Sequence, residues 1–191
     1  MICTRGRTDR PCAALLPMVA WFSLLVAARL VLSSADVQED LFAAVRDDDV
    51  AKISAALGAG ADINARGVGG QTPVMHGTLQ GKVAAVTYLL DHGADVTVPE
   101  KDGYTPPHGA GYQGRAPIVK LLAERGIPID EPHADGYTPI MRACWGREKR
   151  HAKTVSAFLD AGAKLPSKAS CRTTNDHTLR LLDRLQIPDE L

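Results

Sequence analysis

A Thr-Pro pair that returns at a fixed interval is the feature that most constrains the fold of this chain. The pair occurs every 33 residues, at Thr72-Pro73, Thr105-Pro106 and Thr138-Pro139. A threonine hydroxyl can cap a helix, and proline is tolerated at the first helical position because the N–H that it lacks would have no partner there. A glycine stands two residues before each threonine, where a tight turn requires positive φ. The chain is therefore predicted to contain repeated helical units, each opened by a turn and a Thr-Pro cap.

Each unit also carries a second apolar segment with helical spacing. The segments are Val83, Val86, Leu89 and Leu90, then Ile118, Leu121 and Leu122, then Val155, Phe158 and Leu159. A glycine follows each segment, and the last interval between these glycines is 36 residues because residues 147–151 insert about one helical turn. Since one unit cannot bury its apolar stripe alone, the units are expected to stack along one continuous core.

This pattern resembles the repeat unit of the ankyrin repeat family over about residues 39–165. The best match runs Asp102-Gly-Tyr-Thr-Pro-Pro-His-Gly-Ala, then Gly114, Ile118-Val-Lys-Leu-Leu and Gly126. The chain departs from the family pattern at Pro107, at Met75 and Met141 in the histidine position, at Ile127-Pro128, and at the insertion after Gly146. The resemblance implies an all-α ankyrin-repeat solenoid of stacked helix-turn-helix units with hairpin loops and helical caps.

The repeat register also predicts how the chain is divided. We expect a signal peptide or signal anchor at 1–35, an N-terminal capping unit at 36–69, repeats at 70–102, 103–135 and 136–166, and a C-terminal capping helix with a tail at 167–191. Within the last segment, residues 167–171 are predicted to form a loop. The closing helix is predicted to begin at a capping Asn175 and to place Leu179, Leu182 and Leu185 on one side, against the core.

The first 35 residues have the zones of a secretory signal. Three arginines precede an apolar run, and small residues including Ser33 and Ala35 end it, so cleavage is expected after Ala35. The alternative is an uncleaved anchor, because residues 13–32 approach the length that spans a bilayer, although Pro17 and Arg29 interrupt them. The chain is therefore expected to be secreted or to reside in the secretory-pathway lumen, or else to be membrane-anchored with its repeats on the lumenal or extracellular side.

Composition excludes several classes of ligand. The 22 basic and 22 acidic residues give zero formal charge, which disfavours nucleic acid as a partner. The four cysteines form neither a disulfide framework nor a paired zinc-ligand pattern, and the glycine-rich stretches lack the context of a phosphate loop, so no metal and no cofactor is expected. Cys144 is predicted to pack as a small apolar residue and Cys171 to lie in a loop. Their pairing in an oxidising compartment is the less favoured alternative.

The resemblance implies a partner-binding surface, because family members contact partners through hairpin tips and first helices. Matching positions give a partner-binding set, which comprises Gln71, Leu79, Tyr104, Tyr112, Tyr137, Trp145 and Arg142. With only 5% aromatic residues in the chain, four aromatics at these positions favour a binding surface. The alternative for Tyr104 and Tyr137 is packing on the neighbouring hairpin. Basic residues cluster in the fourth repeat and could receive an acidic or phosphate-bearing partner, although a solvated run is the more common meaning of such a cluster: Arg142, Arg147, Lys149, Arg150 and Lys153.

The sequence thus predicts a non-catalytic protein-binding module whose partner is a protein of unspecified identity. A small secretory-pathway enzyme using Cys144 or His108 is one alternative, although His108 occupies a family position where the side chain is expected to bond the turn backbone. A purely structural spacer is the other. Fold class alone does not choose among them.

Overall fold

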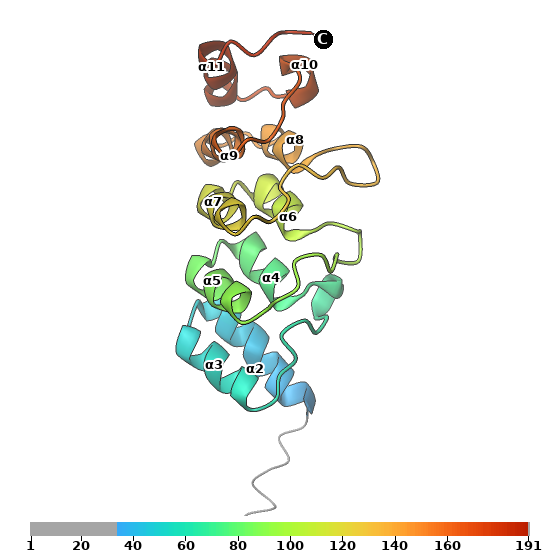
Figure 1. Ribbon diagram of the computed structural model, residues 1–191, viewed down its shortest axis with the longest axis vertical. Helices are drawn as coiled ribbons and strands as arrows, with labels where there is room; N and C mark the ends of the chain where they lie inside the picture. The colour runs from blue at the N-terminus through green and yellow to red at the C-terminus, as the bar shows by residue number, and fades with distance from the viewer. Residues whose placement is uncertain (1–33, 191) are drawn as a thin grey trace, which may run out of the picture. The chain divides into compact units, whose positions relative to one another are not determined.

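The computed structural model describes residues 34–190, and within that range the regular structure is helical, with no strand. Three antiparallel helix pairs stack on one another along the chain (Figure 1). The first helices of these pairs are α4 (Pro73–Gln80), α6 (Pro106–Gln113) and α8 (Pro139–Cys144). The second helices are α5 (Val83–Asp91), α7 (Ala116–Glu124) and α9 (Lys149–Asp160). The predicted all-α solenoid is confirmed.

The pair that precedes them has the expected helices without a Thr-Pro cap. It consists of α2 (Ser34–Asp47) and α3 (Val50–Gly58), with Asp49 accepting from the backbone N–H of Lys52 to cap α3. A 3-10 turn, η1 (Val68–Gly70), leads into α4. The predicted signal segment lies outside the described residues except for its last two, which occupy the first turn of α2. In residues 34–190, no helix combines the length and the apolar character that crossing a membrane requires.

The three Thr-Pro pairs open their helices in different ways. Each proline stands at the helix start as predicted, and the glycine before each threonine has positive φ. Thr72 caps α4 by accepting from the N–H of Met75 at 3.4 Å. The predicted cap is wrong for Thr105, whose hydroxyl instead bonds Nδ1 of His108 at 2.9 Å, and for Thr138, whose hydroxyl has no hydrogen-bond partner within the described part of the chain.

The second helices supply the continuous core that the apolar stripes predict. Fully buried positions recur along the stack at Val86, Leu89, Ile118, Leu122, Val155 and Phe158. Val83 departs from the prediction, because it begins α5 and is 37% exposed. The first helices approach one another closely at Gly111, where an added Cβ would collide with the carbonyl oxygen of Pro139 in the next repeat. A glycine at that position therefore allows α6 and α8 to pack at short range.

The insertion and the closing segment both affect the fourth repeat. The insertion lengthens α9 to 12 residues, against 9 in α5 and in α7. The predicted loop at 167–171 is instead largely α10 (Lys168–Cys171), because the Ser167 hydroxyl accepts from the N–H of Ser170 and starts a helical turn.

The closing helix α11 (Asp176–Arg184) starts at the predicted cap but buries another face. Asn175 accepts from the N–H of His177, while its amide donates to the carbonyl oxygens of residues 146 and 148. These bonds to the repeat fix the rotation of the helix. The buried residues of α11 are Thr178, Leu181 and Leu182, whereas Leu179 and Leu185 are exposed. Of the three leucines predicted to face the core, only Leu182 does so.

The prediction that Cys144 and Cys171 remain unpaired is wrong. Cys144 does not pack as an unpaired apolar residue, because it forms a disulfide with Cys171. Helix α10 lies against α8 and brings the two Cα atoms to 5.2 Å. Both cysteines are fully buried. The disulfide therefore attaches the closing segment covalently to the fourth repeat.

Candidate binding surface

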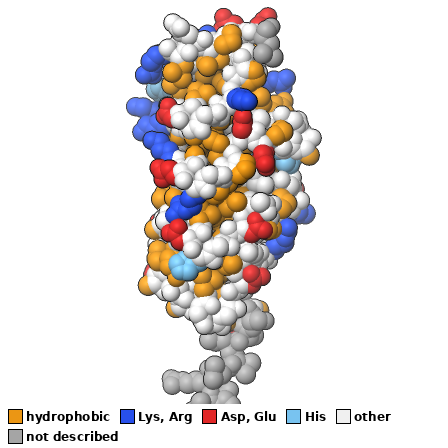
Figure 2. All heavy atoms as spheres, in the orientation of Figure 1, with side chains coloured by type: hydrophobic (Ala, Val, Ile, Leu, Met, Phe, Trp, Pro, Cys, Tyr) orange, Lys and Arg blue, Asp and Glu red, His pale blue; other side chains and the backbone are white. Residues whose placement is uncertain are grey.

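The first helices and the hairpins before them carry the predicted partner-binding set. Tyr112 and Trp145, at the ends of α6 and α8, are 60% and 36% exposed. Leu79 at the equivalent place on α4 is half-buried, as are the hairpin residues Gln71 and Tyr104. On the face drawn in Figure 2, hydrophobic side chains extend along the stack, and Lys and Arg side chains stand mainly at its two edges. The exposed aromatic residues therefore follow the repeat axis at the predicted 33-residue interval.

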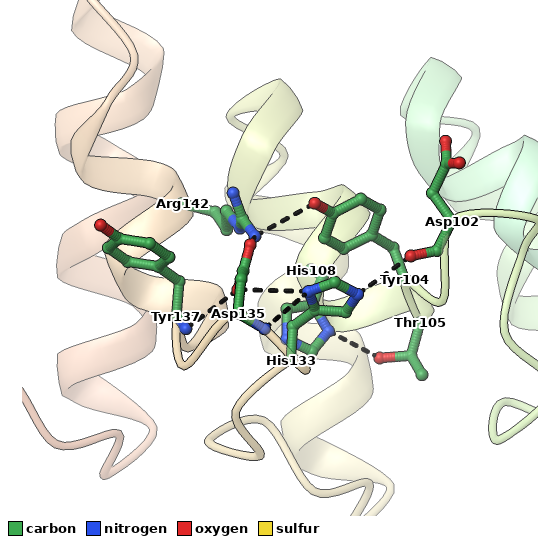
Figure 3. Close-up of polar contacts among 8 residues, drawn as sticks. All are labelled: Asp102, Tyr104, Thr105, His108, His133, Asp135, Tyr137 and Arg142. Atoms are coloured by element: carbon green, nitrogen blue, oxygen red, sulfur yellow. Dashed lines mark hydrogen bonds and ion pairs between the residues drawn. The ribbon is translucent and has the colours of Figure 1, made fainter.

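Arg142 differs from the rest of that set because only 6% of it is exposed. Its guanidinium carbon lies 4.9, 5.3 and 4.4 Å from the ring centroids of Tyr104, Tyr137 and Trp145. The guanidinium also pairs with Asp135 and donates to the Tyr104 hydroxyl at 3.1 Å (Figure 3). Its charge is thus balanced within the fourth repeat, whereas the other basic residues of the predicted cluster, on the insertion and α9, are exposed.

Tyr104 and Tyr137 both pack on neighbouring groups. The Tyr104 ring stacks on His133 at 4.1 Å, and that histidine bonds the Asp102 carbonyl oxygen through Nε2 at 3.0 Å (Figure 3). The Tyr137 ring meets Trp145 edge-on at 4.9 Å. The hydroxyl of Tyr137 accepts from Arg172, which precedes the closing helix. Tyr104 thus packs on the neighbouring hairpin, whereas Tyr137 packs on the end of α8 and on the closing segment; Tyr112 and Trp145 are the exposed aromatic pair.

Asp135 anchors this arrangement through several donors. Burial raises its pKa, but the N–H of Tyr137, the guanidinium of Arg142 and the imidazole of His133 outweigh that effect and lower the pKa of Asp135 to about 2. The carboxylate is therefore ionised at neutral pH. It holds the hairpin and the first helix of the fourth repeat together.

A hollow of about 440 Å³ lies between α4 and α6. Five of the predicted set line it, namely Gln71, Leu79, Tyr104, Tyr112 and Arg142, whereas Tyr137 and Trp145 do not. The sequence reasoning missed Glu100 and Asp102, which belong to the hairpin before α6, and it missed Met75 and Gly109 at the base. Glu100 and Asp102 stand 33 residues before His133 and Asp135, so the two pairs occupy equivalent positions on neighbouring hairpins. Comparing the hairpins in this register would have indicated the two carboxylates.

The hollow has negative character. Burial raises the pKa of Glu100 despite the hydrogen bond that the carboxylate accepts from Gln71, and the neighbouring Asp102 charge acts in the same direction as burial. Burial first, and then the charges of His133 and Arg142, lower the pKa of His108 to about 4, so this histidine is neutral at pH 7. The charge of Arg142 is offset by its partner carboxylate. The hairpin carboxylates thus dominate the local field.

The residues considered for catalysis are poorly placed for it. Cys144 presents no thiolate because it is disulfide-bonded. His108 is only 4% exposed, with Nδ1 bonded to Thr105. Within residues 34–190, no group of three or more His, Cys, Asp or Glu side chains is arranged to hold a metal ion.

The comparison with known families agrees with this geometry. The model for ankyrin repeats (3 copies) matches residues 41–133, which run from within α2 to beyond α7. No curated protein matches the chain. Residues 41–133 are therefore ankyrin repeats, within a fold that is helical and without strands throughout residues 34–190. Ankyrin repeats generally serve as protein-protein interaction modules, and proteins built from them are typically non-enzymatic.

Proposed function

We propose that this protein is a non-catalytic recognition module that binds a partner protein along α4, α6 and α8. The exposure of Tyr112, which lines the hollow, and of Trp145 at the equivalent place in the next repeat carries this proposal. Rigid aromatic side chains supply large contact areas at low entropic cost and often dominate interface energetics. The partner would cover these two rings, and the hairpin tips would set its position.

We further propose that the module works in an oxidising compartment. Disulfides persist in secreted and lumenal proteins and are rare in the cytosol. The buried Cys144–Cys171 bond supports this location, as does the signal-like sequence of residues 1–35. Cleavage after Ala35 would release the module, whereas an uncleaved segment would anchor it with the repeats facing the lumen or the exterior.

Crosslinking capture followed by mass spectrometry tests the binding function. The Tyr112→Ala/Trp145→Ala variant is expected to fold and to lose a partner that the unchanged protein captures from the same secretory source. Val83→Ala and Leu179→Ala are matched controls, since both residues are 37% exposed but lie on α5 and α11. Equal loss in the controls, or unchanged capture by the aromatic variant, would contradict the proposed surface.

A carboxy-terminal fluorescent tag and N-terminal sequencing test the location. Entry into the endoplasmic reticulum with a new terminus at Asp36 is expected. An intact Met1 in the membrane fraction would instead favour the anchor. A diffuse cytosolic signal would contradict both forms of the proposal.

A further inference from the structure

The fourth repeat shows how this scaffold accommodates an arginine. Arg142 lies among Tyr104 of the preceding repeat and Tyr137 and Trp145 of its own, and it pairs with Asp135 on its own hairpin. Aromatic faces attract the guanidinium, and the carboxylate satisfies its donors. The chain thus contains an arginine site that it fills with its own side chain.

The third repeat has the corresponding residues in the same register but no arginine. Counting back 33 residues, Asp102 replaces Asp135, Tyr104 replaces Tyr137, Tyr112 replaces Trp145, and Gly109 stands where Arg142 does in the next repeat. The three side chains and the glycine all line the hollow. The glycine contributes no side chain, and a hollow of about 440 Å³ remains between α4 and α6, with the ends of Met75 and Leu79 beside the glycine.

The charges of the third repeat also suit a cation. Glu100 stands where the fourth repeat has His133, so the hollow has one carboxylate more than the filled site. Within the described residues, the Asp102 carboxylate makes no hydrogen bond or ion pair. Glu100 accepts a bond from the neutral amide of Gln71 at 3.3 Å. Both carboxylates are thus available for pairing.

We propose that the hollow between α4 and α6 receives an arginine side chain of the partner protein. The guanidinium lies against the exposed ring of Tyr112, in the hollow that Tyr104 also lines, and it pairs with Asp102 and Glu100. Arginine fits better than lysine because its planar group stacks on a ring while pairing with a carboxylate. This inference rests on the proposed protein-binding function and specifies the chemistry of the partner, which presents a basic rather than an acidic side chain here.

An NMR titration of the purified protein with N-acetyl-arginine methylamide tests the site. The derivative is expected to shift the signals of Tyr104 and Tyr112 with a Kd on the order of 1 mM. The citrulline derivative has nearly the same shape without the charge and should give no saturable shift. The glutamate derivative should also fail. Saturable binding of either of these, or no shift with up to about 20 mM of the arginine derivative, would overturn the proposal.

Variants separate the carboxylates from general surface charge. Glu100→Gln/Asp102→Asn is expected to weaken binding of the arginine derivative about tenfold. Glu124→Gln is the matched control, because it removes an exposed carboxylate at the end of α7, outside the hollow. Equal affinity in the double variant and the control would contradict the assigned pairing.

A third variant places an arginine inside the hollow. Gly109→Arg is expected to fill the space and pair with Asp102, abolishing binding of the derivative. The flexible ends of Met75 and Leu79 must shift, since they lie 2.9 and 3.1 Å from a Cβ added there. Circular dichroism checks that the variant folds. If it does not, Gly109→Gln supplies a shorter, uncharged filler with the same expected loss of binding. Full binding by a folded variant would overturn the placement.

The two proposals fail in different ways. If Tyr112→Ala/Trp145→Ala loses a captured partner but the arginine derivative causes no shift, the binding function stands and the arginine site is wrong. If the derivative binds but no partner is lost, the use of the site in protein recognition is wrong.

Discussion

The interface between α6 and α8 is closed by its own side chains, whereas the equivalent interface between α4 and α6 is open. Arg142 fills the first, and Gly109 leaves a hollow of about 440 Å³ in the second. Both interfaces have the same backbone register and an aspartate on the hairpin. A single position in the repeat can therefore convert an internal contact into a binding site without altering the fold.

The closed region is also more strongly reinforced than the open one. The fourth repeat carries the disulfide to Cys171, the buried Arg142 and the contacts from Asn175. The second and third repeats are joined by apolar stacking, by hairpin hydrogen bonds and by polar contacts such as the Arg125–Asp91 ion pair, without a disulfide. The array is thus expected to lose stability mainly through its carboxy-terminal half when these reinforcements are removed.

Removing the disulfide is expected to have the largest effect. Cys144→Ala/Cys171→Ala releases a link between residues 27 apart in sequence and should lower the free energy of unfolding by about 3 kcal/mol. Urea unfolding measures the change. Reducing the unchanged protein with dithiothreitol is the control and should produce a similar loss. Equal stability of oxidised and reduced protein would show that the closing segment is held by packing alone.

Removing the buried arginine is expected to cost less. Arg142→Ala loses cation–π contacts with three rings and leaves the Tyr104 hydroxyl without its donor, which should destabilise the protein by about 2 kcal/mol. Arg147→Ala, an exposed change in the insertion, is the control and should stay within about 0.5 kcal/mol. Thermal unfolding compares the two. Equal effects would mean that the interface between α6 and α8 does not depend on the arginine.

Acid should destabilise the closed region through His108. Its pKa is about 4 in the folded protein against an ordinary 6.5, so the unfolded chain binds more protons between these values. The free energy of unfolding therefore falls as pH drops through that range, by about 1 kcal/mol from pH 7 to 5.5. Below pH 3.8, protonation of Asp135, whose folded pKa is about 2, adds a further loss.

The His108→Gln variant isolates the contribution of that histidine. Its stability should depend less on pH between 6.5 and 4, measured by urea unfolding across the range. The stability of the variant should still depend on pH to a smaller extent because of His76. Burial, with the charge of Arg46, lowers the pKa of that histidine as well. An identical slope in variant and unchanged protein would show that His108 is not held neutral by the fold.

The sequence predicts the stack of helix pairs because its determinants are local. Thr-Pro pairs, positive-φ glycines and apolar spacing act within one unit, and stacking follows from repetition. The same register correctly places Tyr112 and Trp145 at exposed helix ends. These features required no information about contacts distant in sequence.

Other features were missed because they depend on contacts between residues distant in sequence. The disulfide requires α10 to lie on α8, and the buried face of α11 is set by Asn175 bonding residues 146 and 148. Arg142 belongs to a basic run in sequence, but its burial depends on the Tyr104 ring, which reaches it from the preceding repeat. Periodicity does not encode such pairings.

The smallest expected effect tests the open interface itself. Gly109→Ala gains helix propensity in α6, but its Cβ displaces the ends of Met75 and Leu79, so the net change in stability should stay within about 0.5 kcal/mol. Gly58→Ala at the end of α3 is the control, because an added Cβ meets nothing within 4 Å and reports propensity alone. Urea unfolding measures both variants. A loss of several kcal/mol at Gly109 alone would mean that the two side chains cannot move and that the hollow is rigidly shaped, whereas near-equal stabilities show that the space can adapt to a side chain entering it.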